Sequence, residues 1–167
     1  ELNTALDVLA PTAGFLPFGH TDLTALSLAK QQRDLLNAID LTRSIALGRP
    51  IFNAPIQGIA DRKTVAILNE QGVRTIVSNE FLRNNERETT SAVATSASNP
   101  VLVHDLAASK CLSGADESDA AFFKSVTCIT SEIGMMTAES PQSSRSVIVL
   151  APENWKISPE RLTALMA

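Results

Sequence analysis

Short apolar segments alternate with longer amphipathic segments along most of this chain. Runs of apolar and β-branched residues of strand length predict strands at residues 14–18, 51–56, 73–77, 100–103 and 147–150. Apolar residues at helical spacing predict one or two helical turns at residues 2–9 and helices at 23–47, 62–71, 106–112, 118–138 and after Ser158. The polar stretch at residues 83–99 predicts a long excursion with one weak strand near Val93.

The predicted strands show little alternation of apolar and polar residues, which is typical of strands buried on both faces. Such strands, separated by helices, indicate an α/β fold with a mostly parallel sheet of about five to six strands. The chain is too short for the eight units of a complete (β/α) barrel. We therefore expect residues 1–167 to form a single domain, an incomplete or irregular (β/α) barrel, with an open doubly wound, flavodoxin-like sheet as the alternative.

Composition narrows the classes of partner. The 167 residues carry a formal net charge of −4, and 44% of them are apolar while 19% are charged. This acidic balance disfavours binding to nucleic acid or to an anionic membrane surface. No apolar stretch reaches the roughly 18 residues of a transmembrane helix. Because the chain starts at Glu1, we expect it to be a piece of a longer protein.

Ligands of α/β proteins bind where parallel strands end and loops lead into helices. Polar side chains and one tryptophan at such positions form a candidate ligand-binding rim: His20, Asp22, Asn53, Asn79, Glu80, His104, Asp105, Glu153 and Trp155. Imidazoles and carboxylates that converge on one rim can hold a divalent metal that activates water, or can act as a general acid and base.

These residues also have structural interpretations. Asp22 and Asp105 directly precede helical segments and fit the N-cap position. His20 and His104 fit hydrogen-bonded loop residues, and Trp155 fits an anchor of the C-terminal helix, with a sugar-stacking ring as its alternative. The sequence does not assign catalytic residues.

Several common chemistries leave no motif in this sequence. The glycines form neither of the phosphate-binding loops, G-x-G-x-x-G and G-x-x-x-x-G-K, and no G-x-S-x-G nucleophile elbow is present. The two cysteines, Cys111 and Cys128, do not fit a zinc signature. We expect two buried free thiols, with a single bridge between them, which requires an oxidising compartment, as the alternative.

Four segments in combination carry a resemblance to a known family. They are residues 16–22 (LPFGHTD), 54–59 (APIQGI), 65–73 (VAILNEQGV) and 147–155 (VIVLAPENW). In order and spacing they resemble the large actinobacterial membrane-anchored envelope proteins of unknown function that are encoded beside the lipid II flippase. The first segment of that family carries Asp at the position of His20, so only Asp22 matches it there.

The resemblance implies a barrel-like extracytoplasmic domain of the cell envelope, anchored to the membrane through parts outside this sequence, and a setting in cell-wall assembly. It implies a non-catalytic or degenerate carbohydrate-active-like domain, without a cofactor, that binds a wall glycan, a lipid-linked precursor or a partner protein.

Two other hypotheses stay open. A distant similarity to polysaccharide deacetylases suggests a metal-dependent hydrolase of cell-wall glycan. In that case His20, Asp22 and His104 would hold one divalent metal, and Glu80 or Asp105 would act as the base. The remaining hypothesis is an open-sheet regulatory domain that docks a partner through residues 83–99.

Overall fold

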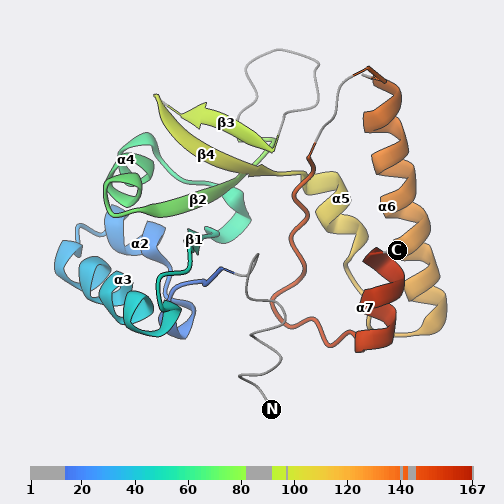
Figure 1. Cartoon of the computed structure of the whole chain (residues 1–167), viewed down its shortest axis with the longest axis horizontal. Helices are drawn as coiled ribbons and strands as arrows, with labels where there is room; N and C mark the ends of the chain where they lie inside the picture. Colours follow the sequence, from blue (N-terminus) through green and yellow to red (C-terminus); the bar gives the residue numbers. More distant parts are fainter. Residues whose placement is uncertain (1–13, 82–91, 97, 140, 143–145, 167) are drawn as a thin grey trace. The chain divides into compact units, whose positions relative to one another are not determined.

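The computed structural model describes residues 14–81, 92–96, 98–139, 141–142 and 146–166. The chain divides into two compact units: the first contains residues 1–77 and 93–102, and the second contains residues 78–92 and 103–167. Figure 1 shows the helices and strands of both units. The helical turns expected at residues 2–9 and most of the excursion expected at 83–99 lie outside the described residues.

Four strands form one open sheet, in the order β1 (Ile51–Asn53), β2 (Val73–Ser78), β4 (Asn99–His104) and β3 (Val93–Ser96) (Figure 1). β1 pairs with β2 in parallel, with Ile51 opposite Val73. β3 pairs with β4 antiparallel, with Val93 opposite Leu102. The sheet is mostly parallel, which confirms the predicted α/β class, but it does not close into a barrel.

The number of strands is smaller than expected. The segments 14–18 and 147–150 each contribute one isolated parallel bridge, from Phe15 to Ile51 and from Ile148 to His104. Pro17 has no amide hydrogen to continue the first ladder, and the chain turns directly after it. In the second segment the amide of Leu150 donates to Ser109 Oγ at 3.0 Å, and therefore it is not available to a neighbouring strand.

The described residues of the two units contain different helices. The first unit holds α2 (Leu23–Leu28), α3 (Gln32–Ala46), α4 (Arg62–Glu70) and two single 3-10 turns, η1 (Phe18–His20) and η2 (Ile56–Gly58). The second unit holds α5 (Leu106–Cys111), α6 (Asp119–Glu139) and α7 (Pro159–Met166). Among the described residues, no helix combines the length and the apolar character that a membrane crossing requires.

The core of the first unit lies between its helices and β1. Leu23 of α2, Leu35 and Ile39 of α3, Ile51 of β1 and Leu68 of α4 belong to one buried cluster. Each of these aliphatic side chains stabilises the fold by about 1.5–3 kcal/mol when it leaves water. This core fixes the position of the turn η1, since α3 contacts it.

The single helix expected over residues 23–47 was wrong, because the chain forms two helices there. α2 ends at Leu28 and α3 begins at Gln32, and between them Lys30 has a φ of 57°. This left-handed conformation cannot continue a right-handed helix. Leu28, which would face the core of a continuous helix, is instead 64% exposed.

The second unit is held together by a disulfide. Cys111 of α5 and Cys128 of α6 form a bridge with a Cα–Cα distance of 5.5 Å. The expectation of two free thiols was therefore wrong. The two cysteines meet because α5 and α6 pack side by side after the chain turns at Gly114, which has a φ of 77°.

Candidate functional site

In the second unit, the ends of β2 and β4 are joined by the side chains of Asn79 and Asp105. Asn79 Nδ2 donates to Asp105 Oδ2 at 2.9 Å, while Asn79 Oδ1 accepts from the amide of Leu106 at 3.2 Å. Asp105 Oδ1 accepts from the amide of Ala108 at 2.8 Å and so caps the N-terminus of α5. The structural interpretation of Asp105 is confirmed, and both side chains are occupied in fixing the start of α5.

His104 is buried beside this pair, with 4% of its surface exposed. Its Nδ1 lies 3.2 Å from Ser109 Oγ. Ser109 Oγ donates its single proton to the carbonyl of Asp105 at 2.5 Å and accepts from the amide of Leu150. The hydroxyl can therefore only accept from the imidazole, which places the proton of neutral His104 on Nδ1.

Burial lowers the pKa of His104 below its ordinary value of 6.5. The backbone and the carboxylate charge of Asp105 act in the opposite direction, but they do not outweigh the loss of hydration. His104 is therefore neutral at neutral pH. Its ring is fixed by the hydrogen bond to Ser109, close to the bridge between His104 and Ile148.

The other predicted rim residues of the second unit do not join this network. Glu80 and Glu153 are exposed. Trp155 is half-buried, and its indole Nε1 is buried without a hydrogen-bond partner among the described residues. The structure thus brings together Asn79, His104 and Asp105, and leaves the carboxylates of Glu80 and Glu153 in solvent.

In the first unit, Asn53 and Asp22 have structural partners. Asn53 is 2% exposed, and its Nδ2 donates to Thr24 Oγ1 at 3.1 Å, which ties the end of β1 to the start of α2. Asp22 Oδ1 accepts from the amide of Ala25 at 3.0 Å and caps α2, as the structural interpretation predicts. His20 is exposed in η1.

The three residues suggested as metal ligands belong to different units, His20 and Asp22 to the first and His104 to the second. Within the part of the chain that the structure describes, no three His, Cys, Asp or Glu side chains gather closely enough to hold a metal ion. The metal-dependent alternative therefore has no geometric observation in its favour and stays a prediction.

Sequence reasoning missed a pair of matching turns in the first unit. In η1, Pro17 and Phe18 precede two left-handed residues, Gly19 and His20. In η2, Pro55 and Ile56 precede two left-handed residues, Gln57 and Gly58. Each turn closes with the same hydrogen bond, in which the fourth residue donates to the proline carbonyl, at 3.1 Å in η1 and 2.9 Å in η2.

These two turns present apolar side chains to solvent. Leu16 and Phe18 at η1 are 50% and 54% exposed, and Ile56 and Ile59 at η2 are 69% and 53% exposed. Because Phe15 and Ile51 pair in parallel, both turns follow the carboxyl ends of neighbouring segments of the sheet. We call Leu16, Phe18, Ile56 and Ile59 the apolar turn surface. The shared Pro-apolar start of the two turns was the signal in the sequence that could have found it.

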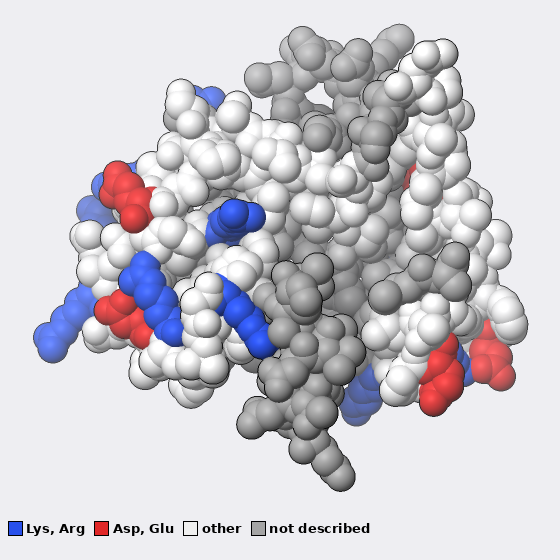
Figure 2. All heavy atoms as spheres, in the orientation of Figure 1, with Lys and Arg blue, Asp and Glu red and all other residues white. Residues whose placement is uncertain are grey.

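Charged side chains of one sign do not form a separate patch on the face drawn in Figure 2. On the face drawn in Figure 2, Lys and Arg side chains are interspersed with Asp and Glu side chains. The apolar turn surface is distinguished by its place at the carboxyl ends of the sheet.

Comparison with known proteins found no matching family model, no matching curated protein and no matching solved structure.

Proposed function

We propose that this chain is a non-catalytic binding domain of a cell-envelope protein, and that it docks a partner protein of the envelope through the apolar turn surface. The observation that carries the proposal is the pair of matching turns, which expose two apolar side chains each at the carboxyl ends of neighbouring sheet segments. Exposed apolar groups at such a place mark a surface that is covered by another molecule.

Backbone strain supports a binding role for these turns. His20 and Gln57 have φ values of 54° and 59°, a region that costs a non-glycine residue about 1–3 kcal/mol. Such residues persist where the surrounding structure holds them, and they cluster at ligand-binding loops. Each lies within two residues of an exposed apolar side chain, Phe18 in η1 and Ile56 in η2.

The chemistry of the surface favours a protein over a glycan. Three of its four side chains are aliphatic, and Phe18 is the one ring among them. Glycans are held by aromatic rings and by polar groups that match hydroxyls, whereas aliphatic side chains fit the apolar core of a protein interface. A wall glycan and a lipid-linked precursor are outcomes that the experiment below distinguishes.

The disulfide between Cys111 and Cys128 supports the proposed extracytoplasmic location, since disulfides persist mainly in oxidising compartments. The proposed membership of the actinobacterial envelope family rests on the four resembling segments, two of which contain η1 and η2. The order of β1, β2 and β4, which follows the chain without a reversal, favours the incomplete barrel over the doubly wound alternative.

Site-specific photo-crosslinking in the native envelope tests the proposal. A photoreactive phenylalanine analogue at position 18 or 56 should give one discrete protein adduct. The same analogue at position 41, where Leu41 is also 53% exposed, serves as the matched control and should give none. The purified partner should then bind the chain directly, and Phe18→Asp should abolish that binding while Leu41→Asp leaves it unchanged.

Other results would overturn the proposal. Adducts of equal yield from positions 18, 56 and 41 would show that the surface has no special role. Sedimentation of the chain with isolated wall glycan, lost in Phe18→Asp, would replace the protein partner by a glycan.

Elemental analysis separates this proposal from the metal-dependent alternative. Protein purified without chelator should contain no stoichiometric zinc, nickel, cobalt or manganese. About one equivalent of such a metal, lost in His20→Ala, would instead support a hydrolase and would call for a deacetylase assay.

A further inference from the structure

The second unit contains a cavity of about 320 Å³ beside the disulfide. Its walls come from the end of α5, the turn that follows it and the first half of α6, and both Cys111 and Cys128 line it. This volume falls within the roughly 300–1,000 Å³ of small-molecule sites. Neither the predicted rim nor the apolar turn surface includes any residue of this cavity.

Charged side chains surround the cavity without being paired. Lys110, Lys124 and Glu117 line it, and none of them has an ion-pair partner among the described residues. Two ammonium groups and one carboxylate leave the lining with a net charge of +1. The cavity therefore attracts an anion, while Glu117 can accept a hydrogen bond from a donor on the same ligand.

Ser125 provides a further hydrogen-bonding group in this cavity. It lines the cavity and is only 4% exposed, yet its hydroxyl has no hydrogen-bond partner within the described ranges. A ligand oxygen in the cavity would satisfy it.

The walls of the cavity are well fixed. The disulfide joins α5 to α6, and the turn between them is closed by backbone hydrogen bonds from Ser113 to Lys110 at 3.1 Å and from Glu117 to Gly114 at 3.0 Å. A site held in this way loses little conformational freedom when it binds, which favours affinity for a small molecule.

We propose that this cavity binds a small hydroxylated anion, of hexose size or less, that carries a carboxylate or a phosphate group. The anionic group lies between Lys110 and Lys124, a ligand hydroxyl donates to Glu117, and the hydroxyl of Ser125 donates to a ligand oxygen.

Three hexoses that differ only at carbon 6 test this proposal on the whole 167-residue chain. Glucuronate supplies a carboxylate, glucose 6-phosphate supplies a phosphate, and glucose supplies neither. Amide signals of residues 110–117 and 124–128 should shift in NMR spectra on titration with glucuronate or with glucose 6-phosphate at matched ionic strength. Titration with glucose should not shift these amide signals. A response to glucuronate alone identifies a carboxylate ligand, and a response to glucose 6-phosphate alone identifies a phosphate ligand.

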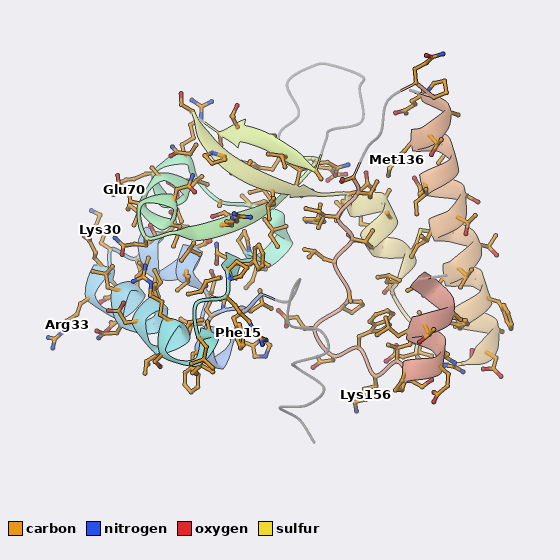
Figure 3. All side chains as sticks on the ribbon, viewed as in Figure 1. Phe15, Lys30, Arg33, Glu70, Met136 and Lys156 are labelled. Carbon is orange, nitrogen blue, oxygen red and sulfur yellow. A yellow bond between two sulfur atoms is a disulfide. The ribbon has the colours of Figure 1, made fainter. Side chains whose placement is uncertain are left out.

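Substitutions of the lining residues test whether the anion binds in this cavity. Lys124→Ala and Lys110→Ala should each weaken binding about tenfold, because each removes a charge-assisted hydrogen bond. Lys156→Ala is the matched control: Lys156 lies on the segment before α7 and is not part of the cavity lining (Figure 3), so affinity should not change. Ser125→Ala should weaken binding while the folded spectrum is retained.

Three results would overturn the proposal: no shift with either anion, equal shifts with glucose, or an equal loss of affinity in Lys156→Ala. These outcomes do not depend on the crosslinking at Phe18, because that surface belongs to the first unit and this cavity to the second.

Discussion

Two threonines in the first unit, Thr42 and Thr75, are each 1% exposed but differ in their hydrogen bonds. Thr42 Oγ1 donates to the carbonyl of Ala38 at 2.7 Å and accepts from the amide of Phe18 at 2.9 Å. Thr75 Oγ1 is buried without any partner in the described part of the chain. Replacement of each threonine by valine should therefore have opposite effects on the free energy of unfolding at the two positions.

Thr75→Val should raise the free energy of unfolding by about 1 kcal/mol, because it removes a hydroxyl that folding desolvates without compensation. Thr42→Val should lower it by about 1–2 kcal/mol, because the amide of Phe18 then loses its acceptor. Urea unfolding followed by circular dichroism measures both. A loss of stability in Thr75→Val comparable to that in Thr42→Val would contradict the expectation.

His104 should make stability depend on pH. Burial lowers the pKa of its imidazole below 6.5, so between the two pKa values the unfolded chain binds a proton that the folded chain does not. Stability should therefore be greatest above the unfolded-state pKa of 6.5 and fall as the pH decreases from 6.5 towards the lower pKa of the folded state. His104→Asn can still donate to Ser109 but cannot titrate, and its unfolding midpoint should vary less over this range. Equal slopes for both proteins would rule out His104 as the source.

At the scale of single elements, the break between α2 and α3 depends on one residue. Lys30 has a φ of 57°, and its amide donates to the carbonyl of Ser27 at 3.0 Å. A left-handed residue with a side chain costs about 1–2 kcal/mol, and glycine avoids most of that cost. Lys30→Gly should therefore raise the melting temperature, whereas Lys30→Ala should not. If both variants melt alike, the lysine conformation carries no strain.

The connection between α5 and α6 also depends on a single link. The disulfide joins residues separated by 17 positions, so its loss should lower the free energy of unfolding by about 3 kcal/mol. Trp155, the one tryptophan of the chain, lies in the second unit and reports its unfolding by fluorescence. Denaturation with and without reductant measures the effect. Cys111→Ser with Cys128→Ser should reproduce the reduced protein, and an unchanged midpoint would contradict the expectation.

For the whole molecule, the pattern of apolar segments predicted the α/β class because buried strands and amphipathic helices have different periodicities. It could not predict the number of strands. Val147–Leu150 has the composition of a buried strand. However, the amide of Leu150 donates its hydrogen bond to the hydroxyl of Ser109, which is far away in sequence. Only the tertiary structure brings that acceptor to the segment.

The candidate site, like the fold, was predictable from the sequence only in part. Asp22 and Asp105 occupy N-cap positions that the sequence indicates directly, because an aspartate stands before each helical segment. Phe18 belongs to an apolar run that predicts burial, yet it is 54% exposed, since the turn η1 directs it away from the core. The pairing of Cys111 with Cys128 depended on the close packing of two helices, which spacing alone does not reveal.

The order of the strands has a consequence for how the protein can be made. β1, β2 and β4 lie in the sheet in the order in which they are synthesised, and β3 pairs with β4, which directly follows it. β2 and β4 can therefore each be added to an edge that already exists when they leave the ribosome, and β3 has to wait only for β4. No early strand has to stay unpaired until the C-terminus arrives, so folding from the N-terminus can begin before the chain is complete.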